Sequence, residues 1–206
     1  MKHSSIGVIL LLLILLGIGN VEAQEAIDLG LSVKWASCNV GANHATEFGN
    51  CYAWGEIETK VAYTPQNSKW FGVGFDALKH QGVIDEYGNL TSEHDAASFV
   101  LGYDWRLPTR FELEELKTKC QWEWVTQHGV DLFMITGPNG NSIYLPATGY
   151  KVEQDDYNAS IYGYYWSATA YRNDKKAYGL SYINDYYDRD FYLNRYCGRY
   201  IRAVHK

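Results

Sequence analysis

Residues 105–116 read Trp-Arg-Leu-Pro-Thr-Arg-Phe-Glu-Leu-Glu-Glu-Leu and hold the clearest structural signal in the chain. Thr109 and Glu112 stand three residues apart, as in a capping box, where each side chain satisfies an unpaired backbone donor of the first helical turn. Leu113, Leu116 and Cys120 then fall on one helix face. The stretch therefore predicts a helix of about three turns that starts at Thr109 and packs on a sheet through that face.

Outward from this helix, the chain is typical of short strands joined by turns, because 19 glycines punctuate it while only four prolines do. Partly alternating apolar residues predict a strand over residues 27–36. Two runs on either side of residues 136–141 predict a hairpin with a Gly/Asn turn. Residues 92–101 predict a short helix, and residues 59–89 predict a long loop. Further strands are expected around 52–54 and at 163–167, 177–183 and 200–204. Together these elements predict an α+β fold with strands in excess.

The first 23 residues predict a cleaved signal peptide. Lys2 supplies a basic start, residues 6–18 form an uncharged apolar run, and residues 21–23 have the small-x-small pattern of a cleavage site. The apolar run has 13 residues, whereas roughly 20 cross a bilayer, so a retained anchor helix is the weaker alternative. We therefore expect an exported protein, periplasmic or extracellular, without a stable membrane span after processing. Its residues 24–206 are expected to form a single domain.

The mature part contains an even number of cysteines, which are Cys38, Cys51, Cys120 and Cys197. In an oxidising compartment this number predicts two disulfides, although four cysteines allow three pairings and the sequence does not choose among them. The alternative is that one or more is a buried free thiol. Because no CxxC spacing occurs, a zinc site or a thioredoxin-type redox role has little support.

The charge pattern and the motifs exclude several function classes. The formal net charge of −6 is spread along the chain without a basic stripe, so nucleic acid is not expected as a partner. The sequence contains no nucleophile elbow, phosphate loop or dinucleotide fingerprint. Its histidines are scattered without a metal-binding spacing. No sequence pattern points to a glycosidase-type carboxylate pair, because its two residues come together in space and not in sequence.

The C-terminal third is rich in tyrosine, since 12 of the 18 tyrosines lie between Tyr157 and Tyr200. Asn and Asp residues are interleaved with them, and this mixture of rigid aromatic area and adaptable hydrogen bonds is typical of antibody-type binding surfaces. Sheet packing is favoured for Tyr164, Tyr178 and Tyr200, because tyrosine is also a good strand former. The predicted ligand-binding residues are Tyr171, Asn173, Asn184, Tyr186, Tyr187, Asp188, Asp190, Tyr192 and Asn194.

Several segments, in order, resemble the Fibrobacter succinogenes major paralogous domain, which is common in exported proteins of gut Bacteroidetes. They are residues 28–36, 38–42, 52–56, 105–109 with Glu112 and Leu116, 145–147 with Gly149, 165–167 and 199–202. The resemblance covers nearly the whole mature chain. It implies a C-type-lectin-like fold, in the superfamily of the formylglycine-generating enzymes, with paired terminal strands and a helix after the Arg-Leu-Pro-Thr segment. It also implies that residues 165–200 are a candidate diversified region of the retroelement type.

The catalytic site of the formylglycine-generating enzymes does not carry over. Those enzymes hold copper with two closely spaced cysteines, because Cu(I) needs two thiolates, whereas Cys197 is alone in the corresponding region. The calcium and sugar signatures of C-type lectins are missing as well. The acids at 185, 188 and 190 could gather round an ion, but a solvated acidic loop is favoured. We therefore expect a non-catalytic protein with no cofactor and no metal.

These observations favour an exported domain that binds a protein or glycan ligand through its Tyr/Asn/Asp-rich C-terminal surface. One alternative is an accessory or structural component of a cell-surface assembly. A less favoured alternative is an enzyme related to the formylglycine-generating enzymes.

Overall fold

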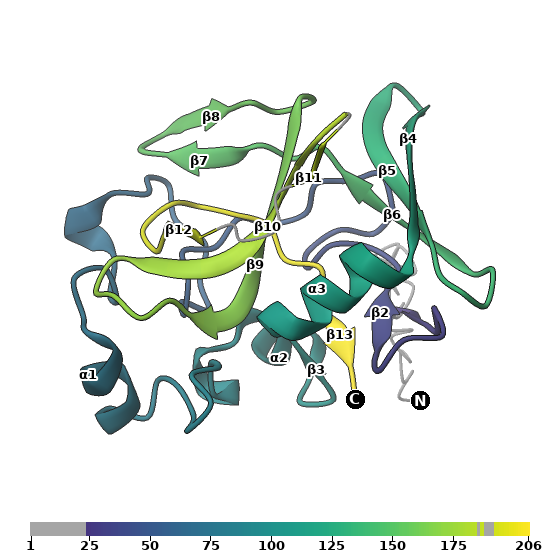
Figure 1. Cartoon of the computed structure of the whole chain (residues 1–206). Coiled ribbons are helices and arrows are strands. Elements are labelled where there is room, and N and C mark those ends of the chain that lie inside the picture. The colour runs from purple at the N-terminus through teal and green to yellow at the C-terminus, as the bar shows by residue number, and fades with distance from the viewer. Residues whose placement is uncertain (1–23, 185, 188–191) are drawn as a thin grey trace, which may run out of the picture.

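The computed structural model describes residues 24–184, 186–187 and 192–206 (Figure 1). In these residues the strands form four small antiparallel sheets, and only 16% of the residues are helical. The protein is therefore mostly β, and the prediction of an α+β, C-type-lectin-like fold is wrong. The physical reason is that the predicted helical segments are short, so that contacts between strands dominate the packing.

One sheet brings distant parts of the chain together, in the order β1-β2-β13-β3. Its strands are β1 (Ala26–Ile27), β2 (Lys34–Ala36), β3 (Trp105–Arg106) and β13 (Val204–His205). Residues 27–36 are thus not one strand. They turn back so that Ile27 pairs with Trp35, because Gly30 adopts a positive φ of 74° and donates its N–H to Asp28 Oδ1 at 2.7 Å.

The helix predicted from residues 105–116 is confirmed as α3 (Arg110–Lys119). Its capping box is complete, with Glu112 N donating to Thr109 Oγ1 and Thr109 N to the Glu112 carboxylate. Leu113 and Leu116 are buried. Figure 1 shows α3 lying against the long hairpin of β9 and β10, strands that it contacts.

A second sheet has the order β4-β5-β6. The predicted hairpin is confirmed as β5 (Val130–Thr136) and β6 (Ser142–Pro146), and β4 (Gln121–Gln127) joins it as a strand that was not predicted. The hairpin turn docks on the N-terminal segment, because Asn139 and Asn141 each donate a side-chain N–H to the Asp28 carbonyl at 2.8 Å.

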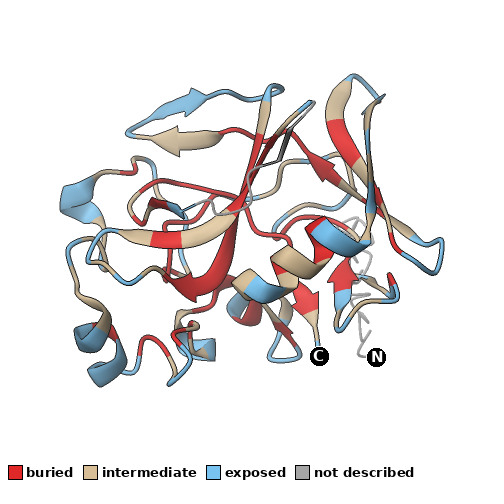
Figure 2. Cartoon of the chain, in the orientation of Figure 1, coloured by how far each residue is buried: buried red, intermediate tan, exposed pale blue. Residues whose placement is uncertain are grey.

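The remaining strands carry the tyrosine-rich segment. β9 (Tyr162–Ala170) pairs with β10 (Lys176–Ile183), which also pairs with β11 (Tyr186–Tyr187) and β12 (Tyr192–Asn194). A separate two-stranded sheet contains β7 (Tyr150–Val152) and β8 (Asp155–Tyr157). Figure 2 shows β9 as mostly buried and β8 as exposed. The strand predicted over residues 200–204 forms only at its last residue, where β13 (Val204–His205) begins.

Two tryptophans at the centre tie β9 to residues 52–54. Trp54 and Trp166 are fully buried, and their indole N–H groups donate to the Ser167 and Tyr52 carbonyls at 3.0 and 2.8 Å. Both rings thus satisfy their polar group inside the apolar core. The strand predicted around Tyr52 is reduced to a single bridge to Arg199.

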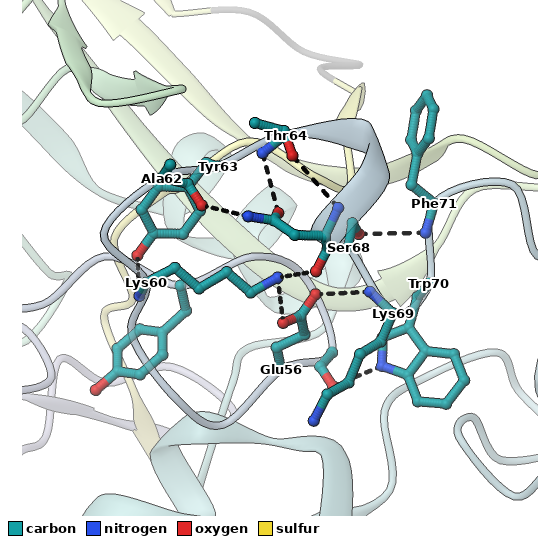
Figure 3. Close-up of polar contacts among 12 residues, drawn as sticks. Glu56, Lys60, Ala62, Tyr63, Thr64, Ser68, Lys69, Trp70 and Phe71 are labelled. Atoms are coloured by element: carbon teal, nitrogen blue, oxygen red, sulfur yellow. Dashed lines mark hydrogen bonds and ion pairs between the residues drawn. The ribbon is translucent and has the colours of Figure 1, made fainter.

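The predicted long loop contains the 3₁₀ helix η1 (Pro65–Asn67) and the helix α1 (Phe75–His80). Figure 3 shows why residues 56–71 are ordered. The buried Glu56 carboxylate pairs with Lys60 at 2.6 Å and accepts the N–H of Lys69 at 2.9 Å. Beside this pair, Thr64 and Asn67 cap η1 reciprocally. The helix predicted at 92–101 is confirmed as η2 (Ser92–His94) and α2 (Ala96–Leu101).

All four cysteines are free thiols, so the structure does not contain the two predicted disulfides. The cysteines lie in different surroundings. Cys51 belongs to an apolar cluster with Tyr63 and Tyr200, whereas Cys197 lines a pocket beside Arg199. The predicted signal peptide, residues 1–23, lies outside the described residues. No helix in the described ranges is long and apolar enough to cross a membrane.

Candidate functional site

A pocket of about 270 Å³ lies where β7, β9, β10 and the segment 192–199 meet. Its aromatic lining consists of Tyr150, Tyr164, Tyr192 and Tyr196, and we name it the tyrosine pocket. Its polar side chains include Lys176, Asn194, Cys197 and Arg199, and none of the described residues that line it is acidic. The volume lies just below the range of drug-sized sites, which begins at about 300 Å³, so it suits one small group of a larger ligand.

One wall of the tyrosine pocket is fixed by ring stacking. Tyr150 faces Tyr157 across the β7–β8 ladder, and their rings stack at 5.4 Å between centroids. Tyr164 meets Tyr150 edge to face at 5.1 Å and stacks on Tyr162 at 5.6 Å. Because each ring is held by another ring, this wall is formed before any ligand arrives.

The opposite side is built on β12. Tyr192 pairs with Tyr178 of β10, and its ring stacks on Tyr171 at 4.6 Å. The ammonium of Lys176 lies 4.4 Å from the centre of the Tyr192 ring. Since Tyr192 remains 40% exposed, it presents aromatic surface to solvent at the edge of the pocket.

Arg199 is the buried cation of the site. Its backbone is fixed by two hydrogen bonds of 2.9 Å with Tyr52, and its side chain is only 3% exposed. The guanidinium carbon lies 4.8 to 5.2 Å from the ring centres of Tyr164, Tyr150 and Trp166. Burial lowers the pKa of Arg199 to about 10, so the group stays charged at neutral pH.

Cys197 lies beside this guanidinium. Burial raises the pKa of its thiol, although hydrogen bonds with Tyr196 and Arg199 act in the opposite direction. The net shift keeps the thiol protonated at neutral pH. Cys197 therefore contributes a small, weakly polar surface to the pocket and not a nucleophilic thiolate.

A larger pocket of about 380 Å³ lies on the side of α1 and the start of α3. Its two cations already have partners. Arg110 donates to the Tyr178 hydroxyl at 3.0 Å and lies over the Phe111 ring, while Arg172 lies over the ring of Phe75. The cation of the tyrosine pocket differs in burial: Arg199 is 3% exposed, and its Nε and Nη1 atoms have no hydrogen-bond partner among the described residues.

The structure brings together some of the predicted ligand-binding residues. Tyr192 and Asn194 line the tyrosine pocket, and Tyr171 supports Tyr192 from behind. Asn173 is a turn residue instead, since its side-chain oxygen accepts the N–H groups of Lys175 and Lys176. Asn184 is exposed at the end of β10 and does not line the pocket.

Tyr186 and Tyr187 form β11, and the structure describes their backbone pairing only. Asp188 and Asp190 lie outside the described residues. In the part of the chain that the structure describes, no three His, Cys, Asp or Glu side chains come together as a metal site requires. Sequence reasoning missed Lys176, Arg199 and Tyr150 as site residues. The motif at 199–202 contained Arg199 but gave no sign of its surroundings.

The comparisons with known proteins give one match. Residues 95–203 match the family model described as a domain of unknown function, DUF8237. No curated protein and no solved structure matches the chain, so no structural neighbour shows a C-type-lectin-like fold. The matched range covers more than half of the 206 residues and contains every residue that lines the tyrosine pocket. This protein therefore belongs to the DUF8237 family.

Proposed function

We propose that this protein is a non-catalytic binding module, exported from the cytoplasm, that recognises one small group of a glycan or protein ligand in its tyrosine pocket. The observation that carries the proposal is the pocket itself. Four tyrosines line it together with polar side chains, and these residues come from separate segments that the fold holds in place. Concave sites with aromatic walls and a few convergent polar groups are typical of ligand binding.

The chemistry of the lining favours binding over catalysis. Tyrosine offers a large contact area at low entropic cost, and the amide of Asn194 adds an adaptable hydrogen bond. The only thiol in the lining is kept protonated by burial. The export expected from the N-terminal sequence would place such a surface where it meets partners outside the cell.

Binding of the purified protein to immobilised glycans and to cell-surface protein extracts tests this proposal. Tyr192→Ala removes the exposed aromatic edge and should weaken binding by at least about tenfold, as loss of a hot-spot side chain does. Tyr103→Ala is the matched control, because Tyr103 is 75% exposed and lies outside the pocket.

A third variant, Tyr87→Ala, separates the two pockets, since Tyr87 lines the larger one. The proposal is refuted if Tyr87→Ala abolishes binding while Tyr192→Ala leaves it unchanged. It is also refuted if neither the glycans nor the extracts bind the wild-type protein. Thermal unfolding of each variant checks that the fold is intact.

A further inference from the structure

Three arginines near the C-terminus, Arg195, Arg199 and Arg202, are all buried, with exposed fractions of 3% or less. Two of them hold the fold together through hydrogen bonds. Arg195 donates to the backbone carbonyls of Lys176, Trp70, Val73, Tyr171 and Asn173. Arg202 donates to Asn39 Oδ1 and to the carbonyls of Ala36, Ser37 and Tyr144. Their charges are thus solvated by protein dipoles.

Arg199 has no such arrangement. Its Nε and Nη1 atoms are buried without a hydrogen-bond partner among the described residues, and the polar group that its side chain does meet is the neutral thiol of Cys197. Among the residues that the structure describes, none forms an ion pair with Arg199. The rings of Tyr150, Tyr164 and Trp166 compensate the charge only in part, because ring quadrupoles are weaker partners than an anion.

The surroundings of Arg199 favour an anion from outside the chain. Lys176 lines the same pocket, and no acidic side chain among the described residues lines it, although the chain as a whole carries a net charge of −6. A buried guanidinium without a counter-charge is costly, and a partner that supplies oxygen acceptors removes that cost. A carboxylate matches the planar fork of a guanidinium.

We propose that the group bound in the tyrosine pocket is the carboxylate-bearing ring of an acidic sugar at a glycan end, with its carboxylate paired to Arg199. This inference rests on the proposed function and narrows its ligand class. The pocket volume of about 270 Å³ suits a single sugar ring. The tyrosine faces offer flat surface to such a ring, while the tyrosine hydroxyls and Asn194 offer hydrogen bonds to its hydroxyl groups.

The first experiment measures binding to an array that carries uronic-acid-terminated, sialic-acid-terminated, sulfated and neutral oligosaccharides. Calorimetry with glucuronate, its methyl ester and inorganic phosphate accompanies it. We expect carboxylate-terminated glycans to bind, and esterification to weaken glucuronate by at least about tenfold. Binding should also weaken as salt increases. Equal binding of phosphate or of sulfated glycans overturns the assignment to a carboxylate.

The second experiment uses Arg199→Met, which keeps an apolar side chain among the aromatic rings around residue 199 and removes the charge. We expect it to lose the preference for acidic over neutral glycans, while its midpoint of urea denaturation stays the same or rises. Arg202→Met is the matched control, because it leaves four bonded acceptors without a donor and should lower the midpoint. If Arg199→Met destabilises the ligand-free protein as strongly as Arg202→Met, the role of Arg199 is structural and the inference falls.

The outcomes also separate this inference from the proposed function. Binding of a neutral glycan or a protein that depends on Tyr192 and not on Arg199 refutes the acidic-sugar assignment and leaves the binding module standing. Absence of any binding by the wild-type protein refutes both.

Discussion

Asp95 predicts an unusual dependence of stability on pH. Its carboxylate is 1% exposed and accepts the N–H groups of Ala97, Ser98 and Leu107 at 2.9, 3.1 and 2.7 Å. It thereby caps α2 and ties it to the segment that leads into α3. Burial raises the pKa of Asp95 from 3.8 to about 6, in spite of the three hydrogen bonds.

The direction of the pH effect on stability depends on which state, folded or unfolded, holds the proton of Asp95. Between pH 3.8 and about 6 the folded state keeps Asp95 protonated while the unfolded state has lost the proton. The free energy of unfolding therefore falls as the pH rises through this window. A difference of about 2 pKa units is worth about 3 kcal/mol, at about 1.4 kcal/mol for each unit.

Urea denaturation followed by tryptophan fluorescence, at intervals from pH 4 to pH 7.5, measures this effect. The Asp95→Asn variant has no titrating group at this position. We therefore expect the stability of the wild type relative to the variant to fall by about 2.5 kcal/mol across the series, since a small part of the effect lies below pH 4. Contributions from other titrating groups, such as His94 and Glu112, cancel in this difference. A difference that stays constant, or that rises with pH, would show that the three N–H groups keep the carboxylate charged and would refute the reasoning.

The remaining predictions concern packing, capping and thiols. Gly163→Ala should destabilise the protein by about 1–3 kcal/mol in urea denaturation, because a Cβ there would overlap the buried ring of Tyr182. Thr109→Ala should cost about 1 kcal/mol by the same measurement, since it removes the side chain that caps α3 through the N–H of Glu112. A thiol reagent, used without reductant, should label Cys120 first in the folded protein, because the other three cysteines are buried, and should label all four after denaturation.

Matched controls accompany these three predictions. Gly74→Ala should cost less than Gly163→Ala, because nothing lies within 4 Å of its added Cβ and only the preference for Gly over Ala at the N-cap of α1 is lost. Thr118→Ala, on the exposed side of α3, should change stability by less than about 0.5 kcal/mol. An unchanged stability of Gly163→Ala would contradict the close approach of β9 to Tyr182. Fewer than four reactive thiols after denaturation would show that disulfides form after all.

Local signals in the sequence predicted the elements that depend on neighbouring residues. The capping box of Thr109 and Glu112 is complete within one helical turn, and α3 begins where it indicates. The hairpin of β5 and β6 follows from its own turn residues. β4 was missed, although Trp122 and Trp124 alternate with polar residues as they would on a strand.

The overall architecture could not be read in the same way. The first sheet joins Trp35, Arg106 and Val204, and no local pattern states which strands pair over such separations. The resemblance implied that the terminal strands pair, and β2 does pair with β13, but the fold class that came with it was wrong.

The candidate site was predicted in part. A count of tyrosines pointed to Tyr192, yet it could not separate that ring from Tyr182, whose hydroxyl donates to the Leu145 and Pro146 carbonyls inside the core. The motif at 199–202 likewise contains two arginines, and their side chains have different surroundings. Arg202 meets carbonyls from residues 36, 37 and 144, whereas Arg199 meets aromatic faces. Those neighbours are fixed only by tertiary structure.

The hydrogen bonds of Arg195 and Arg202 bear on how the chain acquires its structure during synthesis. Arg195 donates to the carbonyls of Trp70 and Val73, and Arg202 donates to the carbonyl of Tyr144. In addition, β2 pairs with β13, which consists of residues 204–205. A ribosome-bound chain that lacks residues 195–205 would have to leave those carbonyls in contact with water, so its core could not close. Folding therefore waits until this segment has emerged, and earlier intermediates remain open enough to be handled as unfolded chains.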